Sequence, residues 1–356
     1  MRTILPILAA AALCLAQETT AEKLIEAGHW KRARAVVEQR LRQAPQDADA
    51  NYLLSQIRAA FGDRTSPLEL ATTAVRLDGG VARYHRQLAE VQGVMAQHAN
   101  LFQQALLARR FRKEIDTALS LDPRDMQALR DLIEYYLMAP GILGGDTNKA
   151  EAVARQIAAL DAVEGLLAGA RIAEFRKDST RTEALLQRAA KLRPPSYKAQ
   201  MALAWFYLAP EHRDDAAAEA LGKGALGLDG GRAEAYCVLA VSYADRANWS
   251  ALETLLSSAA QAVPDDAAPY YRAADRLLTS GREPARSERY LRAYLARDPE
   301  GNQPTVADAH WKLGLALRAQ GREAEAAREW RTALQLDPES PAARELKASR
   351  TASTAD

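Results

Sequence analysis

The stretch that decides the fold runs from residue 311 to residue 338 and reads WKLGLALRAQGREAEAAREWRTALQLDP. Its apolar residues recur at intervals of three and four, which is the pattern of a helix buried on one side. Gly321 interrupts the pattern, and Pro338 ends it because proline lacks the N–H that would continue a helix. The stretch therefore predicts a helical hairpin.

Weaker copies of this stretch recur upstream at a period close to 34 residues. Each copy closes on a residue that stops a helix or follows one: Pro45, Gly79, Pro123, Asp161, Pro194, Gly230, Pro264, Pro299 and Pro338. Small residues recur where the second helix must approach its neighbours: Ala74, Ala118, Ala189, Ala225, Ala259 and Ala333. A hairpin of this size cannot bury its apolar face alone, so the repetition predicts a stack of hairpins.

This arrangement resembles the tetratricopeptide repeat family over almost all of the chain after residue 18. The resemblance implies an all-α, right-handed α-solenoid of about eight to nine helix-turn-helix repeats. We expect the solenoid to span residues 17–347, with a capping helix after its last unit and a disordered tail at 348–356. The expected units are 18–47, 48–81, 82–125, 126–162, 163–196, 197–232, 233–266, 267–300 and 307–340.

The N-terminus has the pattern of a signal peptide. Arg2 is followed by an apolar run from Ile4 to Leu15, with a cleavage site expected near Ala16. The run is shorter than the roughly 20 residues that span a bilayer, so we expect no membrane span in the mature chain. Residues 1–16 thus predict an exported protein, periplasmic or extracellular. A lipoprotein anchored at Cys14 is the alternative.

The sequence offers little support for nucleic-acid binding, metal binding or catalysis. The formal net charge of +1 argues against a nucleic-acid partner. The basic run from Arg109 to Lys113 is interpreted as a solvated helix face because Glu114 and Asp116 follow it. The five histidines show no metal-binding spacing, and Cys237, the cysteine left after cleavage, has no neighbouring base. We therefore expect no enzyme, no catalytic residues, no cofactor and no metal, and a buried Cys237.

Three segments depart from the period. Extra residues at 94–103 and 139–146 fall between the two helices of the third and fourth units. Because such turns share one edge of a solenoid, we expect the two insertions to be neighbours. Four apolar residues are predicted to pack there into a lip: Leu101, Phe102, Ile142 and Leu143. Residues 300–305 lie between units and predict a flexible spacer.

The concave groove is the expected binding surface. The resemblance places one side of each first helix there, with Tyr52, Arg86, Arg130, Glu134, Arg171, Met201, Trp205, Arg272, Arg276 and Trp311 as the predicted lining. Arg86, Arg130 and Arg171 would form a basic track suited to carboxylates. The later tryptophans would supply aromatic anchors.

We therefore expect a scaffold or adaptor that binds a protein or peptide segment, in envelope assembly, secretion or a periplasmic complex. Three alternatives remain open: a periplasmic carrier of a small ligand or lipid, a helical array that reads RNA, and an enzyme with an unfamiliar site.

Overall fold

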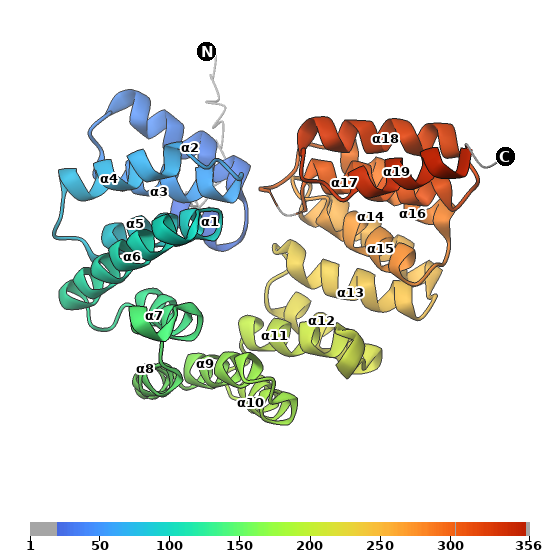
Figure 1. Ribbon diagram of the computed structural model, residues 1–356. Helices are drawn as coiled ribbons and strands as arrows, with labels where there is room; N and C mark the ends of the chain where they lie inside the picture. The colour runs from blue at the N-terminus through green and yellow to red at the C-terminus, as the bar shows by residue number, and fades with distance from the viewer. Residues whose placement is uncertain (1–19, 303, 354–356) are drawn as a thin grey trace, which may run out of the picture.

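The chain is all-helical in a computed structural model that describes residues 20–302 and 304–353. This part contains no strand, and helices account for most of it (Figure 1). The α-helices are α1 Ala21–Glu26, α2 Trp30–Gln43, α3 Ala48–Ala60, α4 Ser66–Leu77, α5 Ala82–Gln97, α6 Leu101–Leu121, α7 Met126–Met138, α8 Thr147–Leu160, α9 Ala162–Phe175, α10 Ser179–Lys191, α11 Tyr197–Leu208, α12 Asp215–Leu228, α13 Ala233–Asp245, α14 Trp249–Ala262, α15 Ala268–Thr279, α16 Pro284–Leu295, α17 Val306–Arg318, α18 Glu323–Leu336 and α19 Ala342–Ser353. Two 3-10 turns, η1 Gly141–Leu143 and η2 Pro210–His212, complete the set.

Consecutive helices pair into hairpins, from α1–α2 to α17–α18, and α19 follows the last pair. The first helices of successive hairpins pack on one another from α1 to α17, whereas the second helices do not pack together to that extent. The first helices therefore line the inside of a curved array, as Figure 1 shows. The predicted all-helical solenoid is confirmed.

The predicted alanine positions carry the close contacts between helices. All six alanines are buried, because each sits where the second helix meets its neighbours. Gly314 shows how tight this packing is in the last hairpin. A Cβ at that position would lie 2.2 Å from Nε1 of Trp330, which is fully buried and donates a hydrogen bond to the carbonyl of Trp311 (3.1 Å). Only glycine leaves room for that ring.

The two ends of the sequence differ in what the structure says about them. The predicted signal peptide lies outside the described residues. At the other end, α19 continues to Ser353, so the helix extends through most of the segment predicted as a disordered tail. The sequence Ala348–Ser353 has no proline or glycine to stop a helix that has already begun. Residues 354–356 lie outside the described residues.

The array closes on itself through residues 300–305, here named the clasp. The expectation of a flexible spacer is wrong for its described part. The Glu300 side chain is 1% exposed and accepts a hydrogen bond from the backbone N–H of Lys31 (2.6 Å). The backbone N–H of Asn302 donates to the carbonyl of Ala60 (2.7 Å). The carbonyl of Pro304 accepts from the hydroxyl of Tyr294. The clasp is held at both ends because the Glu300 side chain and the backbone groups of Asn302 and Pro304 find partners on α2, α3 and α16.

Further contacts join the same two arms. Lys31 Nζ donates to the carbonyls of Asp265 and Asp298, each at 2.8 Å. Arg32 pairs with Asp265, and Arg232 lies 3.7 Å from Glu26 of α1. The first hairpin thus docks on the turns that follow α12, α14 and α16, and the curve becomes a closed ring.

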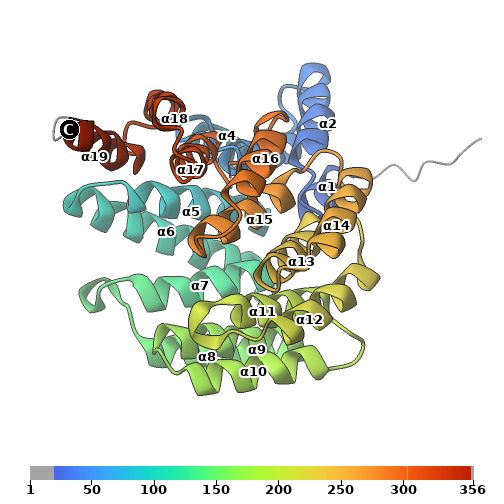
Figure 2. The same ribbon diagram turned by 90° about the vertical axis from the view of Figure 1, so that its right-hand side faces the viewer.

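The two predicted insertions take different forms. The extra residues of the third unit lengthen α5 and α6 instead of forming a loop, while those of the fourth unit form η1. Their turns lie at the same edge of the array, on the left in Figure 2, and η1 contacts α6. The predicted lip does not form there: Leu101, Phe102 and Ile142 are 84%, 82% and 91% exposed, so their side chains are not buried against one another. Leu143 instead contributes its carbonyl, which accepts from the hydroxyl of Tyr135.

Candidate binding surface

The predicted groove residues fall into two classes. Tyr52, Arg86 and Met201 are buried, so they do not line an open groove, and their prediction as groove residues is wrong. Each belongs to a first helix that packs against both neighbours, which covers side chains that a looser array would leave open. The remaining seven are half-buried on the first helices: Arg130, Glu134, Arg171, Trp205, Arg272, Arg276 and Trp311.

The predicted basic track is neutralised within the molecule. Arg130 Nη1 lies 2.9 Å from a carboxylate oxygen of Glu164, and Arg171 makes two hydrogen bonds to Glu134, at 2.8 and 2.9 Å. Each pair joins neighbouring hairpins, because the partners are about one repeat apart in sequence. These arginines hold successive first helices in register and are not open to carboxylates from a partner.

The buried Arg86 is neutralised in the same way. Its Nη1 lies 2.9 Å from Glu90 and 3.6 Å from Asp131 of the next first helix. Burial raises the pKa of the Asp131 carboxyl to about 7, even though the Arg86 guanidinium acts in the opposite direction. The first part of the predicted track is therefore a buried ion pair whose carboxylate titrates near neutral pH.

Trp205 occupies a different position on α11, at the boundary of two depressions in the wall. One, of about 230 Å³, is also lined by Val241 of α13 and Arg272 of α15. The other, of about 490 Å³, extends toward α9 and is also lined by Arg171 and Lys198. The Trp205 indole N–H donates to Glu234 (3.1 Å), which fixes the orientation of the ring.

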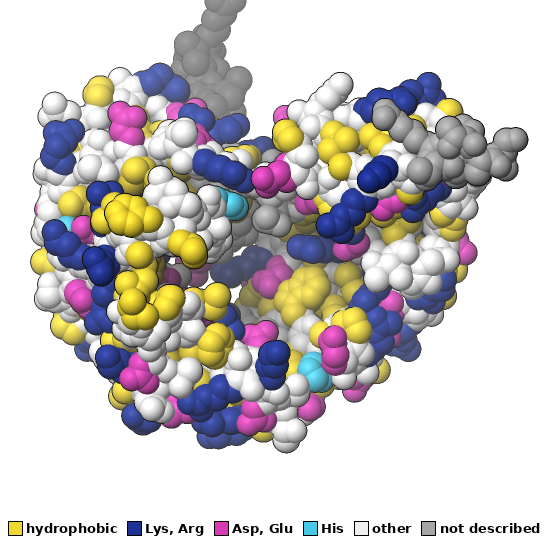
Figure 3. All heavy atoms as spheres, viewed as in Figure 1, with side chains coloured by type: hydrophobic (Ala, Val, Ile, Leu, Met, Phe, Trp, Pro, Cys, Tyr) yellow, Lys and Arg dark blue, Asp and Glu magenta, His cyan; other side chains and the backbone are white. Residues whose placement is uncertain are grey.

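Helices two repeats apart, α11 and α15, touch across α13 near Trp205. The guanidinium of Arg276 on α15 donates to the carbonyl of Leu208 on α11 (2.6 Å) and pairs with Asp245 (2.8 Å). The guanidinium carbon of Arg272 lies 5.9 Å from the centroid of the Trp205 ring. These contacts make α11, α13 and α15 a concave wall, visible in Figure 3 as part of the hollow between the two arms.

Arg272 differs from the other cations of this wall because it forms no ion pair with any described residue. Arg276 is neutralised by Asp245, and Lys312 by Asp275. Arg272 instead offers its charge beside an aromatic ring. An aromatic anchor next to a guanidinium that forms no ion pair can hold an apolar side chain and a carboxylate of one bound segment. Trp205 and Arg272 are therefore the best-supported recognition pair among the predicted groove residues.

The other predicted tryptophan of the wall, Trp311 on α17, has a less open environment. Lys312 Nζ lies 5.0 Å from the centroid of its ring, and its indole nitrogen is buried without an acceptor. The Trp311 carbonyl is occupied by the indole N–H of Trp330. These contacts give Trp311 mainly a packing role within the last hairpin.

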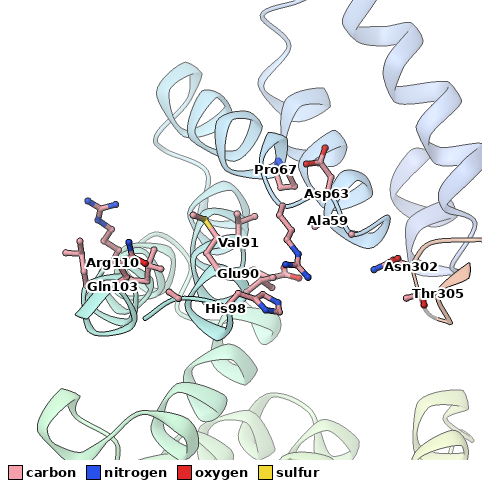
Figure 4. Close-up of a pocket in the computed structure, with 17 residues that line it drawn as sticks. Ala59, Asp63, Pro67, Glu90, Val91, His98, Gln103, Arg110, Asn302 and Thr305 are labelled. Atoms are coloured by element: carbon pink, nitrogen blue, oxygen red, sulfur yellow. The ribbon is translucent and has the colours of Figure 1, made fainter. Parts of the chain in front are cut away.

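A more voluminous cavity than the Trp205 depressions lies elsewhere and was missed by sequence reasoning. It measures about 760 Å³ and lies between α3, α5, α6 and the clasp. In Figure 4, Ala59, Asp63 and Pro67 lie on one side, His98 and Gln103 on another, and Asn302 and Thr305 across from them. Nothing local in the sequence indicates this cavity, because its walls are separated by about 200 residues and meet only when the ring closes.

Residues 20–302 and 304–353 give no support for metal binding, for a reactive thiol or for a membrane-spanning helix. No group of three or more His, Cys, Asp or Glu side chains there is placed to hold a metal ion. Cys237 is buried as predicted, and burial raises the pKa of its thiol, which disfavours the nucleophilic thiolate. None of the helices in this part is both long and apolar enough to cross a bilayer.

Comparison with known proteins finds one family pattern and several solved structures that are similar to parts of this chain. The tetratricopeptide repeat pattern matches residues 307–340. TTC0263, a thermophilic TPR protein in Thermus thermophilus, is 21% identical, with 53% of this chain and 96% of that chain covered and a TM-score of 0.47. PilW, a widely conserved type IV pilus biogenesis factor, is 17% identical, with coverage of 74% and 98% and a TM-score of 0.40. No curated protein matches.

These similarities to solved structures are too low to say anything about function. The matched residues form α17 and α18, which are built like the preceding hairpins, with a buried alanine at the corresponding place of the second helix. Residues 307–340 thus match the tetratricopeptide repeat family, and the hairpins before them have the same helical construction.

Proposed function

We propose that this protein is a non-enzymatic scaffold that binds a peptide or protein segment on the concave wall formed by α11, α13 and α15. The observation that carries the proposal is the pairing of Trp205 with Arg272, an anchoring ring beside a cation that forms no ion pair with a described residue. The wall is held in place by contacts between hairpins, so little conformational freedom is lost on binding.

The shape of the ring restricts the occupant. Because the clasp joins the first hairpin to the turns of the last hairpins, the gap between the two arms is bridged. A folded domain would have to open this bridge to reach the wall from the side. We therefore propose that the bound element is an extended or helical segment, with an apolar side chain for the Trp205 depressions and a carboxylate for Arg272.

The cellular setting is a separate proposal and rests on residues 1–16 alone. Their charged start, apolar run and small residues near Ala16 support export to the periplasm or the cell exterior, with a role in envelope assembly, secretion or a periplasmic complex. Fractionation of cells that produce the full-length chain tests this proposal. A chain that stays in the cytoplasm with its first residues intact would contradict it.

The binding proposal is tested by affinity capture from the envelope fraction with wild type, Trp205→Ala and Arg272→Glu. The matched control is Trp249→Ala, because Trp249 is a half-buried tryptophan on the second helix α14 with Arg286 at 4.6 Å over its ring. We expect the concave-wall variants to lose the captured protein and the control to retain it.

Circular dichroism separates loss of binding from loss of fold, since each variant should keep the helix content of the wild type. Retention of the partner by both concave-wall variants would contradict the proposal. A small molecule that co-purifies with the chain in native mass spectrometry, in place of a protein, would favour the alternative carrier function.

A further inference from the structure

The first half of α6 carries apolar side chains that the fold does not use. Leu101 and Phe102 begin this helix, and both are almost fully exposed. Ile115 and Ala118 are the residues of α6 that are buried, and both belong to its second half. At 21 residues, α6 is the longest helix of the described chain. Its first turns therefore add apolar surface without adding to the core.

The exposed side chains continue onto the neighbouring elements. The α6 edge, as we name this surface, comprises Val94, Leu101, Phe102, Leu106, Met138 and Ile142. η1 contacts α6, which places Ile142 close to this helix. Hydrophobic side chains gather over α6 and α7 on the face turned to the viewer in Figure 3. Contiguous exposed apolar patches on soluble proteins commonly mark interaction sites.

The 760 Å³ cavity adjoins this surface, since Val94 and Leu106 line both. Its other apolar lining includes Val91, Met95 and Leu107. A large apolar side chain from a partner could enter here beside the helix. The α6 edge thus offers exposed apolar side chains and, beside them, a cavity for one large side chain. A partner helix can use both, whereas a flat partner surface cannot fill the cavity.

Cations outnumber unpaired carboxylates around the α6 edge. Four cations there make no ion pair with any described residue: Arg64, Arg109, Arg110 and Lys113. The acidic residues of α6 already have partners, because Glu114 lies 2.7 Å from His85 and Asp116 lies 2.9 Å from Arg112. In the cavity, Glu90 pairs with Arg86, whereas Asp63 stays ionised and accepts only from the neutral groups of Thr65 and Ser66.

We propose that the α6 edge is a second docking surface, separate from the concave wall, for an amphipathic helix that carries acidic residues. Phe102, Leu106, Arg110 and Lys113 recur at intervals of three and four, so they share one side of α6. Phe102 and Lys113 are about 16 Å apart along the helix axis. A partner helix of three to four turns would place apolar side chains at Phe102 and carboxylates at Arg110 and Lys113.

The test uses the full chain and a synthetic fluorescein-labelled helix of about 18 residues, enough for the required turns. One end of its binding face carries Leu and Phe, and the other carries Glu; a second peptide has Lys in place of each Glu. Fluorescence anisotropy should show that the acidic peptide binds about tenfold or more tightly than the basic one. Phe102→Asp should weaken this binding by a similar factor.

Two further variants complete the design. Exchanging both Arg110 and Lys113 for Glu should reverse the preference, so that the basic peptide binds better. Leu336→Asp is the matched control, because Leu336 is a half-exposed apolar residue on α18, and it should leave binding unchanged. Circular dichroism should show wild-type helix content for all variants, since none of the replaced side chains is buried.

Several results would overturn the proposal. Equal binding of the acidic and basic peptides, or no binding of either, would remove the charge argument. Binding that survives Phe102→Asp but is lost with Trp205→Ala would place the peptide on the concave wall. Binding to vesicles containing phosphatidylserine that is lost with Phe102→Asp, with no peptide binding, would assign the surface to a membrane. A dimer that Phe102→Asp dissociates would assign it to self-association.

Discussion

Replacing Lys31 with alanine should loosen the clasp while leaving the hairpins intact. The Lys31 ammonium donates to the carbonyls of Asp265 and Asp298 and lies 3.4 Å from a carboxylate oxygen of Glu300. Without it, the Glu300 carboxylate remains buried and keeps only the Lys31 backbone N–H as a donor. These contacts of the Lys31 side chain all cross the ring and none joins α2 to α3. The substitution should therefore act on closure of the ring and leave the hairpins intact.

The magnitude follows from burial. Removing one partner of a buried ion pair costs about 3–5 kcal/mol, but the remaining backbone hydrogen bond and the partial exposure of Lys31 reduce this to about 2–4 kcal/mol. That free energy raises the open fraction of the clasp by about 30-fold to several hundred-fold. Arg32→Ala is the matched control, because the Arg32–Asp265 pair is exposed and contributes less than about 1 kcal/mol.

Hydrogen exchange at the amide of Asn302 measures this opening, because its N–H bonds to the carbonyl of Ala60 across the ring. Exchange should accelerate by the same factor in Lys31→Ala, and by less than about fivefold in Arg32→Ala. Unchanged exchange in Lys31→Ala, or equal acceleration in both variants, would refute the assignment of Lys31 as the main closing contact.

The effect should also depend on pH. Burial raises the pKa of Glu300, and Lys31 opposes that rise. In Lys31→Ala the pKa of Glu300 should therefore rise further, and lowering the pH should protonate the carboxyl and remove the unpaired buried charge. The acceleration should be smaller at pH 5 than at pH 8. A larger acceleration at pH 5 would contradict this sign.

Two other predictions concern the array itself. Gly314→Ala should lower the free energy of unfolding by about 1–3 kcal/mol because the new methyl group collides with Trp330; Gly227→Ala, with open space at its Cβ, should raise it by up to about 1 kcal/mol. Urea unfolding compares them, and equal losses would exclude the collision. Because the pKa of Asp131 is raised to about 7 in the fold, its contribution to stability declines as pH rises from 4 to 7. The free energy of unfolding of Asp131→Asn, relative to that of wild type, should therefore increase by about 2 kcal/mol between pH 5 and pH 8. A stability difference between the two proteins that does not change with pH would contradict the raised pKa.

The hairpins could be predicted from the sequence because their signals are local. Helix stops, small residues and apolar spacing all act within one unit, and the alanine positions are buried as expected. Glu164 illustrates a signal that was present but unused: Arg130 and Lys198 lie 34 residues on either side and both pair with it. Opposite charges one period apart on first helices predict pairs between hairpins.

The ring closure could not be predicted in this way. Lys31 and Glu300 are 269 residues apart, and their meeting depends on small rotations accumulated over every hairpin between them. The composition of residues 300–305 is that of a loop, and only the docked first hairpin gives it fixed partners. The lip was predicted wrongly for a related reason. The insertion at 94–103 lengthens two helices, and its apolar side chains therefore lie away from the core.

Hydrogen–deuterium exchange of the full chain with and without its captured partner tests the central claim most directly. Binding on the concave wall predicts slower exchange in α11, α13 and α15, with the change around Trp205 absent when Trp205→Ala is used. Slower exchange confined to the second helices α12, α14 and α16, or no change along the wall when the partner is bound, would contradict it.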